Sequence, residues 1–163
     1  MELTFYSCAL VALASALRCV THTNPVHSLL YLVVLLLAVA GIFFAIGAPF
    51  AGALEVIIYA GAIMVLFVFV VMMLNLGAET AEQERAWLKP STWIGPVLLS
   101  TVMLASLVFG MLEAPGATGT AMVGAKQVGI SLFGPYLLAV ELASLMLLGA
   151  LVAAYHLGRE ETR

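Results

Sequence analysis

The sequence predicts an all-α integral membrane protein that crosses the bilayer five times. Of its 163 residues, 64% are hydrophobic and 9% are charged, and the mean hydropathy is +1.15. A soluble domain carries about 25% charged residues, so this composition excludes a soluble monomer, a disordered tail and a nucleic-acid-binding protein. A crossing takes about 20 apolar residues. We expect one membrane domain over residues 1–163, with helices at residues 3–20, 29–46, 51–76, 93–112 and 132–157.

Each boundary has a local signal. The first span ends before Asn24-Pro25, a dipeptide that marks a turn. Gly47 and Pro49 end the second span, and Asn75 with Gly77 ends the third. We expect loops at a polar stretch (residues 78–91) and at a glycine-rich one (residues 113–131). All five runs are expected to be helices, because open strands would leave unpaired N–H groups in lipid.

Basic residues predict the orientation. If the N-terminus lies outside, in the periplasm, the inner side receives five basic residues and the outer side receives only Lys126. Loops on the cytoplasmic side of membrane proteins carry an excess of Lys and Arg. The C-terminus is therefore expected in the cytoplasm, on the side of Arg18, Arg85, Lys89, Arg159 and Arg163.

Two acidic residues interrupt the apolar spans. Glu55 lies in the third span, and Tyr59 follows four residues later on the same side of a helix. A carboxylate in a spanning helix costs about 2.5–3.5 kcal/mol on insertion scales, so Glu55 is expected to face protein or water. Glu141 lies nine residues after Leu132, which would place it near the middle of the fifth span. Both are candidates for a proton path, or for polar contacts that hold helices together.

Small residues surround the first of these positions. Gly61 follows Tyr59-Ala60 in the middle of the third span and weakens an α-helix by about 1 kcal/mol relative to alanine. It is expected to mark a bend or bulge beside the polar side, or else close packing of two helices. We expect an irregularity between Tyr59 and Val65.

The sequence offers no ligand set for a metal or redox centre. Cys8 and Cys19 are about 16 Å apart along one helix, too far for a disulfide, and two cysteines alone cannot ligate an iron–sulfur cluster. His22, His27 and His156 are expected in polar loops or at the inner interface. Both lysines lie in predicted loops, so the chain cannot form a buried Lys/Glu proton relay by itself. We therefore expect a subunit of a larger assembly.

Three segments resemble one known family. The segment GALEVIIYAGA and the residues that follow it (52–76) resemble the third helix of the J-subunit family of bacterial NADH–quinone oxidoreductase, respiratory complex I. This family corresponds to chain 6 of the mitochondrial enzyme. TNPVHSLLY (residues 23–31) is similar to the family's first loop and second helix, and LLAVELAS (residues 137–144) to its fifth helix. Residues 78–131 carry nothing diagnostic.

The resemblance implies a multi-pass subunit in the membrane arm, in the bacterial inner (plasma) membrane. It would lie beside the A, K and H subunits and near the N subunit, rather than forming a homo-oligomer of its own. It would belong to an enzyme that couples quinone reduction to proton translocation, without a catalytic centre in this chain. The resemblance also implies that this chain binds no cofactor, and that NADH, FMN, iron–sulfur clusters and quinone are held elsewhere in the complex.

The resemblance also assigns residues. The family's third helix carries a π-bulge and rotates between states; Tyr59 and Gly61 match the bulge region, and Glu55 and Tyr59 match its polar side. Glu141 matches an acidic position in the last helix. A change of register turns side chains about the helix axis, which would exchange Val65 or Phe67 for Tyr59 in a proton path.

Two other functions fit the same residues. Related cation/proton antiporters and membrane-bound hydrogenases contain similar membrane modules. A purely structural assembly subunit would also use polar residues to pair its helices.

Overall fold

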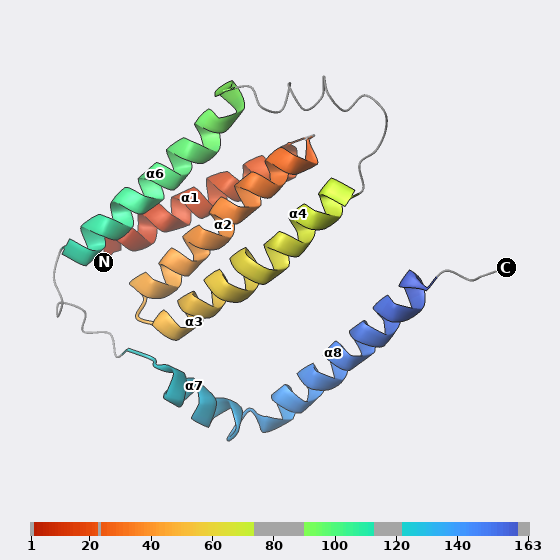
Figure 1. Cartoon of the computed structure of the whole chain (residues 1–163). Coiled ribbons are helices and arrows are strands. Elements are labelled where there is room, and N and C mark those ends of the chain that lie inside the picture. The colour runs from red at the N-terminus through yellow and green to blue at the C-terminus, as the bar shows by residue number, and fades with distance from the viewer. Residues whose placement is uncertain (1, 23, 74–89, 113–121, 160–163) are drawn as a thin grey trace. The chain divides into compact units, whose positions relative to one another are not determined.

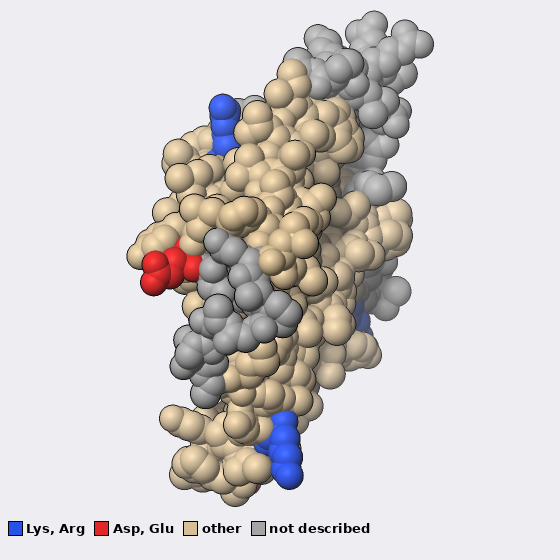
Figure 2. Space-filling model, turned by 90° about the vertical axis from the view of Figure 1, so that its left-hand side faces the viewer, with Lys and Arg blue, Asp and Glu red and all other residues tan. Residues whose placement is uncertain are grey.

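The computed structural model describes residues 2–22, 24–73, 90–112 and 122–159, with backbone alone at residues 72 and 90–92 (Figure 1). Five helical stretches in this part of the chain are long and apolar enough to cross a membrane, which confirms the predicted number of spans. Chain contacts divide the protein into two units, Met1–Met122 and Val123–Arg163. Among the residues that Figure 2 draws in colour, a few isolated charged groups interrupt an uncharged surface.

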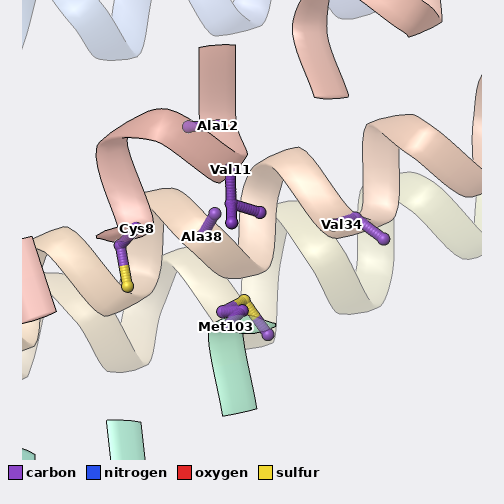
Figure 3. Packing of buried hydrophobic residues seen from close by; sticks show 6 residues of the cluster. All are labelled: Cys8, Val11, Ala12, Val34, Ala38 and Met103. Atoms are coloured by element: carbon purple, nitrogen blue, oxygen red, sulfur yellow. The ribbon is translucent and has the colours of Figure 1, made fainter. Parts of the chain in front are cut away.

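The first unit is built around helix α2 (Pro25–Ala45). Helix α1 (Glu2–Thr21) packs along α2, and α6 (Pro90–Leu112) contacts both. The third span, which consists of α3 (Pro49–Leu54), η1 (Glu55–Ile63) and α4 (Met64–Met73), also lies against α2. The core forms where α1, α2 and α6 meet, and its buried residues are Cys8, Val11, Ala12, Val34, Ala38 and Met103 (Figure 3).

Helix α2 begins four residues before its expected start at residue 29. The side-chain oxygen of Asn24 accepts hydrogen bonds from the backbone N–H groups of Val26 and His27, which satisfies donors that have no partner within the helix. Pro25 occupies the first helical position, where its missing N–H costs nothing. At the other end, Gly47 adopts a φ of 83°, a left-handed conformation that favours glycine.

Some expectations about span ends lie outside the described residues. The third span is described as far as Met73, so its predicted end at residues 74–77, including Asn75 and Gly77, is not covered. The same holds for residues 78–89 and 113–121, and for Arg163. Helix α6 begins at Pro90, and its candidate spanning stretch is Trp93–Leu112, the expected range.

The second unit corrects the prediction for the fifth span. A single helix was expected over residues 132–157, but a short helix, α7 (Ala125–Leu132), and a turn at residues 133–136 precede the spanning helix α8 (Leu137–Gly158). Pro135 explains the break, since it lacks an N–H donor and its ring clashes with the preceding helical turn. The expected loop through residue 131 was therefore wrong for residues 125–131.

Candidate functional site

The third span changes its hydrogen-bonding register midway. It is α-helical in α3, π-helical over the nine residues of η1, and α-helical again in α4. At the junction with α4, the N–H of Met64 donates to the carbonyl of Tyr59, five residues earlier, as well as to that of Gly61. The expected irregularity is confirmed in this span. It begins at Glu55, four residues before the expected region, and ends at Ile63.

The local sequence disfavours the α register here. Val56, Ile57 and Ile58 are β-branched, and such side chains crowd the preceding turn of an α-helix. Gly61 adds the conformational freedom of a residue without a side chain. A Cβ built on Gly61 would lie 3.2 Å from the carbonyl oxygen of Val56, which leaves little room for a larger residue. A π segment is therefore compatible with this sequence.

Two of the described side chains of the third span are buried, one on each side of the π segment. Gly52 is buried in α3, where its Cβ position would lie 3.1 Å from both the Ala40 carbonyl oxygen and a ring carbon of Phe44. Met64, the first residue of α4, is only 2% exposed. No residue of η1 itself is buried. The π segment thus presents much of its side-chain surface outward from the first unit.

Glu55 and Tyr59 lie about one helical turn apart in this segment, and Tyr59 is the more exposed of the two. Glu55 is the first residue of η1 and is half-buried, whereas Tyr59 is 51% exposed. Gly61 belongs to the same segment, so the structure brings these three candidates together. Val65 and Phe67 lie in the α-helix that follows and are 66% and 51% exposed.

Glu141 belongs to the second unit and is exposed there. The expected position near mid-span was wrong, because α8 begins at Leu137 and Glu141 lies about one turn from that end of the span. The Ser144 hydroxyl donates to the main-chain carbonyl of Glu141, at 2.7 Å, and not to its carboxylate. Its carboxylate is therefore open to a neighbour outside its own helix.

The histidines show a relationship that the sequence did not reveal. The rings of His22 and His27 lie 5.1 Å apart, nearly perpendicular, across the turn between α1 and α2. The signal for this tight turn was Asn24-Pro25, the N-cap and first residue of α2. His156 lies in the last turn of α8. Among the described residues, no group of three or more His, Cys, Asp or Glu could hold a metal ion, and both cysteines are free.

Comparison with known proteins shows similarity to one family over nearly the whole chain. The family model for chain 6 of NADH-ubiquinone/plastoquinone oxidoreductase matches residues 15–157. The chain is 63% identical to NADH-quinone oxidoreductase subunit J of Escherichia coli strain K12, over 99% of this chain and 88% of the relative. It is 59% identical to subunit J of Pseudomonas aeruginosa, over 100% of this chain and 99% of that protein.

A more distant relative has the same name. Subunit J from Buchnera aphidicola subsp. Schizaphis graminum is 51% identical, over 99% of each chain. These matches do not favour a cation/proton antiporter or a membrane-bound hydrogenase. The chain therefore belongs to the chain 6 family of NADH-ubiquinone/plastoquinone oxidoreductase, the family of the bacterial J subunits, and is a membrane subunit of that enzyme complex.

Proposed function

We propose that this chain couples quinone reduction to proton translocation through the polar side of its third span. The observation that supports this role most directly is the π segment Glu55–Ile63, which carries Glu55 and Tyr59 and buries none of its residues within the first unit. A carboxylate in a spanning helix is expensive unless it meets protein or water. Glu55 and Tyr59 therefore face a neighbouring subunit or a hydrated path in the assembled enzyme.

The chemistry of the pair suits proton transfer. A carboxylate accepts a proton and a carboxylic acid donates one, while a phenolic hydroxyl both donates and accepts a hydrogen bond. Neither group needs a cofactor for this step. Glu55 would hold the proton, and the Tyr59 hydroxyl would continue the hydrogen-bonded path toward water or a group of the next subunit.

The π register supplies a two-state element. If the segment returns to the α register, its side chains turn about the helix axis relative to α3 or α4. In the second register, Val65 or Phe67 would replace Tyr59 and interrupt the water path. Coupling between distant sites requires an element with two discrete arrangements that both sites can bias.

The remaining expectations form part of the same proposal. The N-terminus lies in the periplasm and the C-terminus in the cytoplasm of a bacterial inner membrane. The chain contacts A-, K- and H-type subunits and lies near the N-type subunit, without forming its own homo-oligomer. Glu141 provides a second acidic group, near the end of α8 at Leu137. NADH, FMN, iron–sulfur clusters and quinone bind elsewhere in the complex.

Substitution of the pair tests the proposal in the assembled enzyme. Glu55→Gln and Tyr59→Phe remove the titrating groups with little change in shape. We expect at least a several-fold loss of proton translocation per NADH oxidised in the double variant, measured in sealed vesicles. Glu2→Gln and Tyr155→Phe are matched controls, since both lie on other helices and are exposed. Normal translocation by both single variants and the double variant would leave only a structural role for this side of the helix.

A further inference from the structure

Several hydrogen bonds link the end of α1 to the start of α2. The Asn24 side-chain oxygen accepts from the N–H groups of Val26, at 2.9 Å, and of His27, at 3.4 Å. The Ser28 hydroxyl donates to the carbonyl of His22 across the turn, at 3.3 Å. The N–H of His22 in turn donates to the carbonyl of Arg18 in the last turn of α1. The turn therefore joins the end of α1 directly to the start of α2.

One of these hydrogen bonds depends on the protonation state of the His22 side chain. The backbone N–H of Asn24 donates to Nδ1 of His22, at 3.2 Å. Nδ1 accepts a hydrogen bond only when it carries no proton. The His22 imidazole must therefore be neutral, with its hydrogen on Nε2. The same tautomer leaves no lone pair on Nε2, which makes His22 a proton site here and not a metal ligand. Protonation at Nδ1 would place a second hydrogen against the Asn24 N–H and break the bond.

The groups that surround His22 come from α1 and α2. On α1, Arg18 lies one turn earlier and Cys19 three residues earlier. On α2, the His27 ring lies 5.1 Å away and the Tyr31 ring 6.3 Å away. From Trp93 onwards α6 carries no charged residue, and α4 carries none. Arg18, whose main-chain carbonyl accepts the His22 N–H, is thus the permanently charged residue that lies beside His22 on α1.

We propose that the hydrogen bonds of His22 with Asn24 and Ser28 form a proton-sensitive contact between α1 and α2. When His22 is neutral, its Nδ1 holds the Asn24 backbone in the position from which the Asn24 side chain caps α2. When His22 takes up a proton, that bond is lost and the first residues of α2 open more often. His22 is partly exposed, so the proton can come directly from water.

Hydrogen exchange on the assembled complex tests this proposal. The readout is the protection of the peptide that covers the turn, at pH 8 and pH 5.5, after correction for the intrinsic pH dependence of exchange. Loss of one hydrogen bond predicts protection lower by about fivefold at pH 5.5 in the native sequence. His22→Asn keeps a side-chain acceptor that cannot be protonated near neutral pH, and we expect its protection to be the same at both values.

The controls separate His22 from other titrating groups. His156→Gln changes an exposed histidine on α8 and should retain the full drop in protection. If His22→Asn fails to assemble, His22→Gln provides the same acceptor on a longer side chain. Equal protection of the native turn at both pH values would overturn the proposal. So would a drop that survives replacement of His22, or one that disappears only in His27→Asn.

Discussion

The carbonyl oxygen of Val56 lies 3.2 Å from the place that a Cβ on Gly61 would occupy. These residues are five positions apart, the spacing of hydrogen-bonded residues in a π-helix. A contact this short requires the neighbouring atoms to move by a few tenths of an ångström. Glycine at position 61 is therefore compatible with the π register. A residue with a side chain at this position would favour the α register.

Gly61→Ala should shift the third span toward the α register. Alanine stabilises an α-helix by about 1 kcal/mol relative to glycine, and its Cβ would press on the Val56 carbonyl in the π register, so both effects act in the same direction. We expect the share of complexes with an unbroken α-helix over Glu55–Ile63 to rise about fivefold, measured by classification of cryo-EM images. Gly149→Ala is the matched control, because nothing lies within 4 Å of that Cβ position. A π segment retained in every class would contradict this expectation.

Gly41→Ala should destabilise the contact between α1 and α2. The added Cβ would lie 2.8 Å from the sulfur of Cys8, which is fully buried in the core. Overpacking of this kind costs about 1–3 kcal/mol. We expect a lower yield of assembled complex and a lower melting temperature. The double variant Gly41→Ala with Cys8→Ala should recover most of the loss, since it removes the atom that clashes. Equal stability of the single and double variants would show that the core accommodates the methyl group elsewhere.

The sequence was sufficient to predict the spans, because a run of about 20 apolar residues is typical of a membrane-spanning helix. Their ends depended on single residues whose effect is local. Pro25 was expected in the connection, yet the Asn24 cap makes it the first residue of a helix. Pro135 lies inside an apolar run and still ends a helix, because a proline disrupts the hydrogen bonds of the turn before it. Hydropathy alone does not distinguish these two positions.

The candidate site was predictable for a different reason. Glu55 and Gly61 are unfavourable in an ordinary spanning helix, so their presence pointed to a special segment. The extent of the π-helix was not predictable, since no pattern of side chains marks where the bonding to the fifth residue back begins and ends. The pairing of His22 with His27 was also hidden, because it depends on how tightly the turn between two helices closes.

Asn24→Ala should weaken the start of α2. The Asn24 side chain caps two N–H groups, and loss of such a cap costs about 1 kcal/mol. We expect faster hydrogen exchange in the first turn of α2 and a modest fall in melting temperature of the complex. Asn24→Asp, which keeps the acceptor oxygen, should behave much more like the native chain. If the alanine variant exchanges at the native rate, the Oδ1 contacts contribute nothing to this helix end.

The charge distribution predicts which way the chain crosses the membrane. An inner side with five basic residues and an outer side with Lys126 alone places the C-terminus in the cytoplasm. Green fluorescent protein fused after Arg163 should therefore fluoresce, because it folds poorly after export. Alkaline phosphatase at the same point should be inactive, because its disulfides do not form in the cytoplasm. Moving the fusion point to Lys126 should reverse both signals, since that residue lies one crossing earlier. Phosphatase activity at Arg163 and fluorescence at Lys126 would show the opposite orientation. Glu55 would then lie on the cytoplasmic side of the membrane centre.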